Sequence, residues 1–247
     1  MRKNALLFSF ASLLLTLCIP ASAQHNMMDS LLLRLQEFSK QTGVKVERIE
    51  KTHEYVDLGL SVKWATCNVG ADKPEEYGDY YAWGEVEPKA SYTWENYRFR
   101  TSGNDESNVR FSKYSFTFVA DNKTRLDLED DVAHVKWGGN WRLPTAQEMN
   151  ELIDSCTWTW TTVNGVNGCL ITSNRPGYTD RSIFLPATGK YGFETDNKSA
   201  GTWGHYWSTS INKDTSYAAG VLAIGSDYAA VKKTFRNHGQ SIRPVCP

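Results

Sequence analysis

The chain has 247 residues, with 27 Lys and Arg against 28 Asp and Glu, and so carries a formal net charge of −1. This balance provides no general attraction to nucleic acid or to anionic lipid, and the only notable basic run, Lys232-Lys233, is a pair. We therefore predict no nucleic-acid partner.

Residues 1–23 have the pattern of a signal peptide. Arg2 and Lys3 form a basic start, residues 5–17 are apolar, and Ala21-Ser22-Ala23 is typical of a cleavage site. The apolar run is shorter than the ~20 residues that a membrane-spanning helix needs. We expect export to the periplasm, the outer cell surface or the medium, with no transmembrane segment.

Cys18 raises the alternative of a lipoprotein, in which a lipid is attached at the cleavage point. Bulky Leu17 precedes it where such sites usually have a small residue, so ordinary cleavage is favoured. Cleavage after Ala23 leaves 25 basic and 28 acidic residues, a net charge of −3.

Residues 24–52 are predicted to be an N-terminal helical segment. Leu31, Leu32, Leu35 and Phe38 share one face of a helix over Met27–Gln41, which Gly43 ends. This face can pack on the main domain, pair with another copy or belong to a stalk; packing is favoured because leucine stripes usually bury.

From His53 onward the pattern changes. Apolar residues alternate with polar ones over residues 56–64, which predicts a half-buried strand, and Tyr80–Trp83 predicts a shorter one. Residues 87–125 are polar and aromatic with a turn cluster at 103–108, and we expect a long excursion with little regular structure.

Two helices follow. Leu128–Lys136 predicts a short helix closed by Gly138. Thr145 with Glu148 three residues later forms a capping-box pattern, which predicts a second helix reaching Ser155.

The remaining chain returns to strands and turns, with residues 225–227 as a hairpin connection. The predicted strands are Gly168–Ser173, Ser182–Leu185, Tyr206–Ser210, Tyr217–Ile224, Ala229–Phe235 and Ser241–Val245. Helices followed by a series of short strands indicate an α+β domain over residues 53–247.

Four cysteines remain after the expected cleavage, which permits two disulfides in three connectivities. We favour Cys67–Cys156 and Cys169–Cys246. Zinc is the alternative, but the sequence has no C-x-x-C pair and its histidines are scattered. We expect no metal and no cofactor.

Aromatic residues supply the candidate binding site. Trp158 and Trp160 project to the same face if their segment is extended, and exposed indoles stack on sugar rings. Trp203 and Tyr206 form a second candidate. The alternative for both groups is core packing, since large aromatics are usually buried.

Acidic residues offer two weaker catalytic hypotheses. Asp130 and Asp131 lie at helical spacing from His134, and Glu85 and Glu87 imitate a glycosidase pair. The first group has no nucleophile nearby in sequence, and acids at a helix N-terminus are explained by the stabilisation they give the helix. For the second group, the sequence does not give the distance between the two carboxyl groups that a glycosidase mechanism requires. We predict no catalytic residues and no enzyme.

Seven segments in order resemble the Fibrobacter succinogenes major paralogous domain and the related C-terminal domain of Legionella collagen-like adhesin. They are residues 54–71, 80–85, 130–134, 137–148 (WGGNWRLPTAQE), 183–189, 206–210 and 241–245. The resemblance covers residues 53–247. It implies a C-type-lectin-like fold with short helices, a small twisted antiparallel sheet, paired chain ends and long loops, in an exported protein of a Bacteroidetes-type bacterium.

The resemblance implies a non-enzymatic binding or adhesion module of the cell envelope, with a glycan or a cell-surface protein as ligand. Calcium-dependent sugar binding is not carried over, because the Glu-Pro-Asn and Trp-Asn-Asp motifs of animal C-type lectins are missing from the sequence. One alternative is a structural envelope or pilus-associated component. Another is an oxidase like the formylglycine-generating enzymes, whose reactive cysteine pair has no counterpart near Ser208–Ser210. The oligomeric state is left open.

Overall fold

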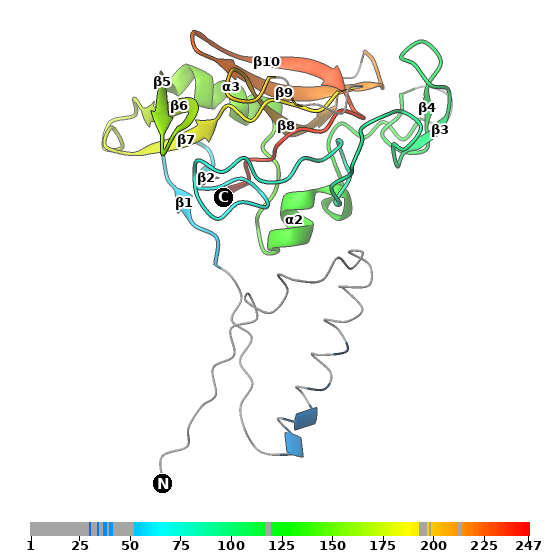
Figure 1. Ribbon diagram of the computed structural model, residues 1–247, viewed down its shortest axis with the longest axis horizontal. Coiled ribbons are helices and arrows are strands. Elements are labelled where there is room, and N and C mark those ends of the chain that lie inside the picture. The colour runs from blue at the N-terminus through cyan, green and yellow to red at the C-terminus, as the bar shows by residue number, and fades with distance from the viewer. Residues whose placement is uncertain are drawn as a thin grey trace. The chain divides into compact units, whose positions relative to one another are not determined.

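The computed structural model describes residues 52–116, 120–192, 197, 199–211 and 214–247, together with six positions nearer the N-terminus (Figure 1). The chain divides into two compact units, Met1–Thr52 and His53–Pro247. The six positions in the first unit are helical: Ser30, Arg34, Glu37, Phe38, Lys40 and Gln41. The expected signal peptide and the rest of the predicted helix Met27–Gln41 lie outside the described residues. No helix in the described part of the chain is long and apolar enough to cross a bilayer.

The second unit is α+β, as predicted, but it contains four small antiparallel sheets where one was expected. Its two ends meet in the first of these sheets. The strands are β1 (Tyr55–Val56), β2 (Lys63–Ala65) and β11 (Val245–Cys246), with β2 in the middle.

The predicted continuous strand over residues 56–64 is wrong. The Gly59 N–H donates a hydrogen bond to Asp57 Oδ1 at 2.9 Å, and Gly59 has a φ of 72°. These features turn the chain back on itself, so that β1 pairs with β2. The alternating apolar residues of this segment therefore reach the core from a loop and not from one continuous strand.

The second sheet has the order β10-β9-β8. Its strands are β8 (Gly204–Ile211), β9 (Ala218–Gly225) and β10 (Tyr228–Phe235). Every residue of the central strand β9 is buried. Ser226 and Asp227 join β9 to β10, which confirms the predicted hairpin.

The third sheet has the order β5-β6-β7. Its strands are β5 (Cys156–Val163), β6 (Val166–Ser173) and β7 (Ser182–Pro186). Asn164 and Gly165 join β5 to β6 with φ values of 49° and 84°, as a two-residue hairpin turn requires. The predicted strands at β6 and β7 are confirmed within two residues.

Helix α3 (Ala146–Ser155) begins with the predicted capping box. The Thr145 side chain accepts from the Glu148 N–H at 3.1 Å, and Glu148 Oε2 accepts from the Thr145 N–H at 2.7 Å. The other predicted helix is broken into a 3-10 turn, η2 (Leu128–Asp130), and α2 (Val132–Trp137). The break occurs because Asp131 is extended and caps α2 with its side chain.

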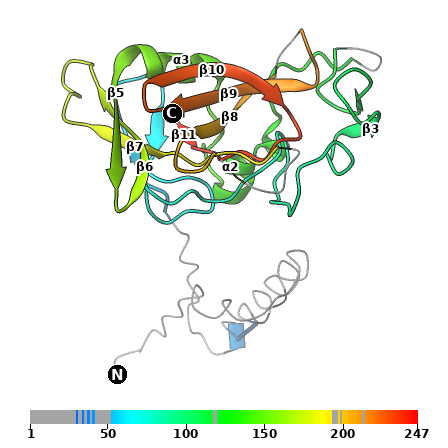
Figure 2. The same ribbon diagram turned by 45° about the horizontal axis from the view of Figure 1, so that its top comes forward.

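The described residues between 66 and 127 hold only a short hairpin, β3 (Arg100–Ser102) with β4 (Arg110–Phe111), which agrees with the predicted irregular excursion. Figures 1 and 2 show this hairpin at the end of the unit opposite β5–β7. The predicted strand at Tyr80–Trp83 is reduced to one bridge between Tyr81 and Gln240, and the predicted strand Ser241–Val245 is reduced to β11.

Two buried clusters fill the second unit. The aliphatic core lies between α3 and the sheets and includes Leu58, Met149, Leu152, Ile171, Leu185 and Leu222. The aromatic core lies under the irregular segment and includes Trp83, Trp94, Tyr97, Phe111, Tyr114 and Trp207. The irregular segment is thus anchored by large buried rings, which substitute for regular strands.

Candidate functional site

A hollow of about 330 Å³ has three tyrosines in its lining. Its lining includes Asp79, Tyr80, Lys89, Tyr92 and Tyr191, and we call it the tyrosine hollow. It forms because the bridges Tyr81–Gln240 and Tyr191–Gly239 hold two distant segments against residues 239–240.

Two glycines allow this close approach. Gly78 has a φ of 70°, and a Cβ there would lie 2.3 Å from the Val69 carbonyl oxygen. A Cβ on Gly239 would lie 2.5 Å from the ring of Tyr92. Any larger residue at either position therefore forces the walls of the tyrosine hollow apart.

Hydrogen bonds fix the rings. Tyr92 Oη donates to the Tyr80 carbonyl at 2.6 Å, and Tyr80 Oη donates to the Thr188 carbonyl at 2.5 Å. The Tyr191 ring meets Tyr80 edge-on at a centroid distance of 4.8 Å and lies 5.8 Å from Tyr92. Burial raises the pKa of Tyr92 to about 12, so its hydroxyl stays protonated. Fixed rings lower the entropic cost of binding a ligand.

The two charged side chains of the hollow have different roles. The Lys89 ammonium lies 2.8 Å from Glu85 Oε2 and donates to the Asn96 carbonyl and Oδ1 at 3.1 Å, so its N–H groups are engaged. Asp79 is exposed and accepts one hydrogen bond from Tyr81 Oη at 3.1 Å. Asp79 thus retains acceptor sites for ligand hydroxyls. Ring faces beside an open carboxylate suit a polyhydroxylated ring.

The predicted platform of Trp158 and Trp160 faces the protein interior. Both indoles share one face of β5, but they pair across the sheet with buried Ile171 and Cys169 and pack on the aliphatic core. Trp158 Nε1 is buried without a hydrogen-bond partner in the described structure. The indoles are half-buried and cover the core, which was the competing interpretation.

The prediction for Tyr206 is wrong. Only 1% of this residue is exposed, and its hydroxyl donates to the Pro186 carbonyl, because β8 runs through the middle of the unit. Trp203 is 39% exposed and meets Tyr228 edge-on at 5.7 Å. None of the four predicted ligand-binding aromatics is among the residues that line the tyrosine hollow.

The four cysteines are free thiols, which contradicts the expected pairs Cys67–Cys156 and Cys169–Cys246. Cys169 faces the aliphatic core, whereas Cys246 lies in a different sheet. Burial raises the pKa of Cys156 and that of Cys169 to about 11, so these thiols are protonated near neutral pH and poorly nucleophilic.

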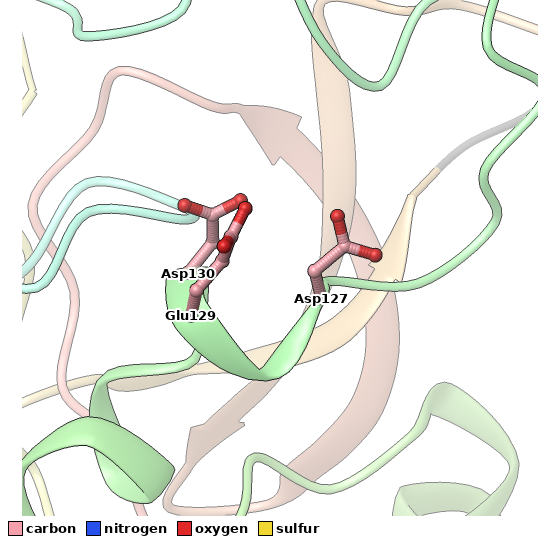
Figure 3. A group of neighbouring side chains, drawn as sticks. All are labelled: Asp127, Glu129 and Asp130. Atoms are coloured by element: carbon pink, nitrogen blue, oxygen red, sulfur yellow. The ribbon is translucent and has the colours of Figure 1, made fainter.

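Three carboxylates gather around the η2 turn, as Figure 3 shows: Asp127, Glu129 and Asp130. The Lys113 ammonium lies 2.7, 2.8 and 2.5 Å from them, respectively, where a metal ion would otherwise meet all three. Burial lowers the pKa of Lys113, but its hydrogen bonds to the carboxylates outweigh this and raise it. Arg98 also lies 2.9 Å from Asp130 Oδ1, and Lys123 pairs with Asp127. Because three cations balance the three carboxylates, we interpret the group as an ion-pair network and not as a metal centre.

The acids that imitate catalytic groups have structural partners. Asp131 accepts from the N–H groups of Ala133, His134 and Leu143. Glu85 is buried against Lys89 and also accepts from the Arg98 N–H at 2.7 Å. Exposed Glu87 lies 3.4 Å from Lys136. These contacts tie loops and helix ends together.

Sequence reasoning missed the residues of the tyrosine hollow. One signal was available: five tyrosines fall within residues 77–97, namely Tyr77, Tyr80, Tyr81, Tyr92 and Tyr97. Tyr191 had no such signal, because its position depends on the long-range bridge to Gly239.

Comparison with known proteins gives no match: no family model, no curated protein and no solved structure resembles this chain significantly. The site must therefore be interpreted from its own geometry.

Proposed function

We propose that this chain is an exported, non-enzymatic binding module of the bacterial cell envelope, whose C-type-lectin-like domain recognises a saccharide in the tyrosine hollow. The observation that carries the proposal is the pair of half-buried rings of Tyr80 and Tyr191, backed by the buried ring of Tyr92, beside the open carboxylate of Asp79. Such a site binds by stacking and hydrogen bonding and requires no bond to break.

Two features of the fold support the lectin-like part of the proposal. The first and last strands of the second unit both pair with β2, as the family resemblance implies. The tyrosine hollow is built from loops and single bridges, and loops held by a rigid scaffold commonly carry binding sites. Export is proposed from the N-terminal sequence pattern alone.

A glycan array followed by calorimetry tests the proposal. We expect Tyr191→Ala to weaken saccharide binding about tenfold, because it removes an aromatic wall. Tyr55→Ala is the matched control, since Tyr55 is 51% exposed in β1 and lies outside the hollow. Binding that is unchanged by Tyr191→Ala, or no binding across the array, contradicts the proposal.

A further inference from the structure

A second hollow has a volume of about 550 Å³. Its lining includes Lys190, Asp214, Tyr217, Lys233, Phe235 and His238, and we call it the lysine hollow. Lys190 and Tyr191 are consecutive residues that line the lysine hollow and the tyrosine hollow, respectively.

The floor of the lysine hollow is aromatic. The Phe235 ring meets Tyr217 edge-on at 5.7 Å and His238 at 5.3 Å. His238 Nδ1 lies 3.1 Å from Thr234 Oγ1, which fixes the imidazole. This floor supplies the same kind of apolar support for a sugar ring as the tyrosine hollow does.

Lys190 gives this hollow a charge that no described residue neutralises. The residue is half-buried, and its ammonium makes no hydrogen bond or ion pair within the described structure. Burial and then the Lys190 charge lower the pKa of His205 and that of His238 to about 4, so neither imidazole is charged near neutral pH. A partly buried cation without a counter-ion is unfavourable, and an anionic ligand group relieves it.

The second cation is already weakly paired. Lys233 Nζ lies 3.5 Å from Asp214 Oδ2, and both side chains are more than half exposed. An exposed pair of this kind contributes little, so Lys233 can turn to a ligand at small cost. Asp214 reduces the positive potential of the hollow.

We propose that the lysine hollow binds the anionic group of an acidic saccharide, a carboxylate or a sulfate ester, with Lys190 as its main counter-ion. The sugar ring that carries this group lies on Tyr217 and Phe235. The inference rests on the proposed function and adds the ligand class to it.

Calorimetry with three probes tests the inference: an oligogalacturonate, the same oligosaccharide after reduction of its carboxyl groups, and a sulfated neutral oligosaccharide. We expect at least one acidic probe to bind about tenfold more tightly than the reduced one, because a charge-assisted hydrogen bond is added. The better acidic probe distinguishes the carboxylate from the sulfate ester. Rising salt should weaken the acidic probe selectively.

Three variants assign the effect to this hollow. Lys190→Gln should abolish the preference for the acidic probe, because it weakens the acidic probe far more than the reduced one. Asp214→Asn should strengthen acidic binding about twofold, a gain that structural damage does not produce. Lys232→Gln is the charge-matched control, because Lys232 precedes Lys233 on β10 but does not line the hollow.

The outcomes separate the two proposals. Equal affinities for acidic and reduced probes, or a preference that survives Lys190→Gln, overturn the acidic-ligand inference and leave saccharide binding intact. Failure of all three probes together with an empty glycan array overturns both.

Discussion

Among single residues, Arg236 is a fully buried cation that is held by several hydrogen bonds. Its guanidinium donates to Tyr97 Oη at 2.9 Å and to the carbonyls of Ser216 and Tyr114 at 2.8 and 3.0 Å. Its carbon centre lies 4.1 Å from the ring centroid of Phe111. Burial lowers its pKa, and neutral carbonyls and ring faces replace the solvent.

Arg236→Lys should therefore lower the free energy of unfolding by about 3 kcal/mol, because a lysine cannot reach these acceptors with a planar fork. Urea unfolding measures the change. Arg181→Lys is the control; Arg181 also lies over a ring, 4.7 Å from Tyr178, but it is exposed, and less than about 0.5 kcal/mol is expected. Equal losses for the two variants contradict the assignment.

His205 and His238 make stability depend on pH. Their pKa values in the folded chain are about 4, against about 6.5 in the unfolded chain, so the unfolded chain binds more protons between these values. The free energy of unfolding should fall as pH drops from about 6.5 towards 4, by up to about 1.4 kcal/mol per pH unit for each imidazole.

Urea unfolding at pH 7, 6 and 5 tests this dependence. His205→Gln should roughly halve the slope, whereas Lys232→Gln should leave it unchanged, since Lys232 is an exposed charge on β10. A slope that persists in the double variant His205→Gln/His238→Gln would exclude these imidazoles as its cause.

At the scale of single elements, α3 depends on its first turn. The side chains of Thr145 and Glu148 accept hydrogen bonds from each other's backbone N–H groups. The Arg142 guanidinium donates to the two carboxylate oxygens of Glu148 at 2.8 and 2.6 Å. Thr145→Ala should cost about 1 kcal/mol of unfolding free energy, while Thr145→Ser, which keeps the capping oxygen, should cost less. Thermal unfolding of both variants provides the comparison, and identical losses would contradict the capping role.

Local chemistry explains which elements were predictable. The start of α3, the end of α2 at Gly138 and the β9–β10 hairpin are each encoded within a few neighbouring residues, and each was predicted. Residues 56–64 are divided between two strands by a turn at Gly59. This turn was not predicted, because Gly59 occupies a polar position of the alternating pattern. At the break, the Asp131 side chain that caps α2 also accepts from the Leu143 N–H, twelve residues away, a contact that the local sequence does not show.

The candidate site was less predictable for the same reason. Its walls come from residues 78–92 and from residue 191, and only long-range bridges bring them together. A ligand platform was predicted at Trp158 and Trp160 because indoles stack well on sugars. The same large apolar surface packs these two residues against the core. Tyrosines, which pair a ring with a polar tip, form the open wall instead.

At the scale of the whole molecule, His53–Pro247 has its own cores and a sheet that joins its two ends. Residues 53–247 alone should therefore fold cooperatively, with a melting temperature close to that of the full chain. Removing residues 244–247 should abolish cooperative unfolding, because it deletes β11 with fully buried Val245. Calorimetry of the two truncations checks both expectations; a cooperative transition after the C-terminal truncation contradicts the closing role of β11.

The pairing of both chain ends with β2 also determines how the domain responds to tension. β1 and β11 are each antiparallel to β2 and so run in the same direction on its two sides. A pull between His53 and Pro247 slides the outer strands lengthwise in opposite directions, so that the hydrogen bonds on each side of β2 are loaded together and not broken one after another. A domain that is pulled at both ends would gain mechanical resistance from this arrangement.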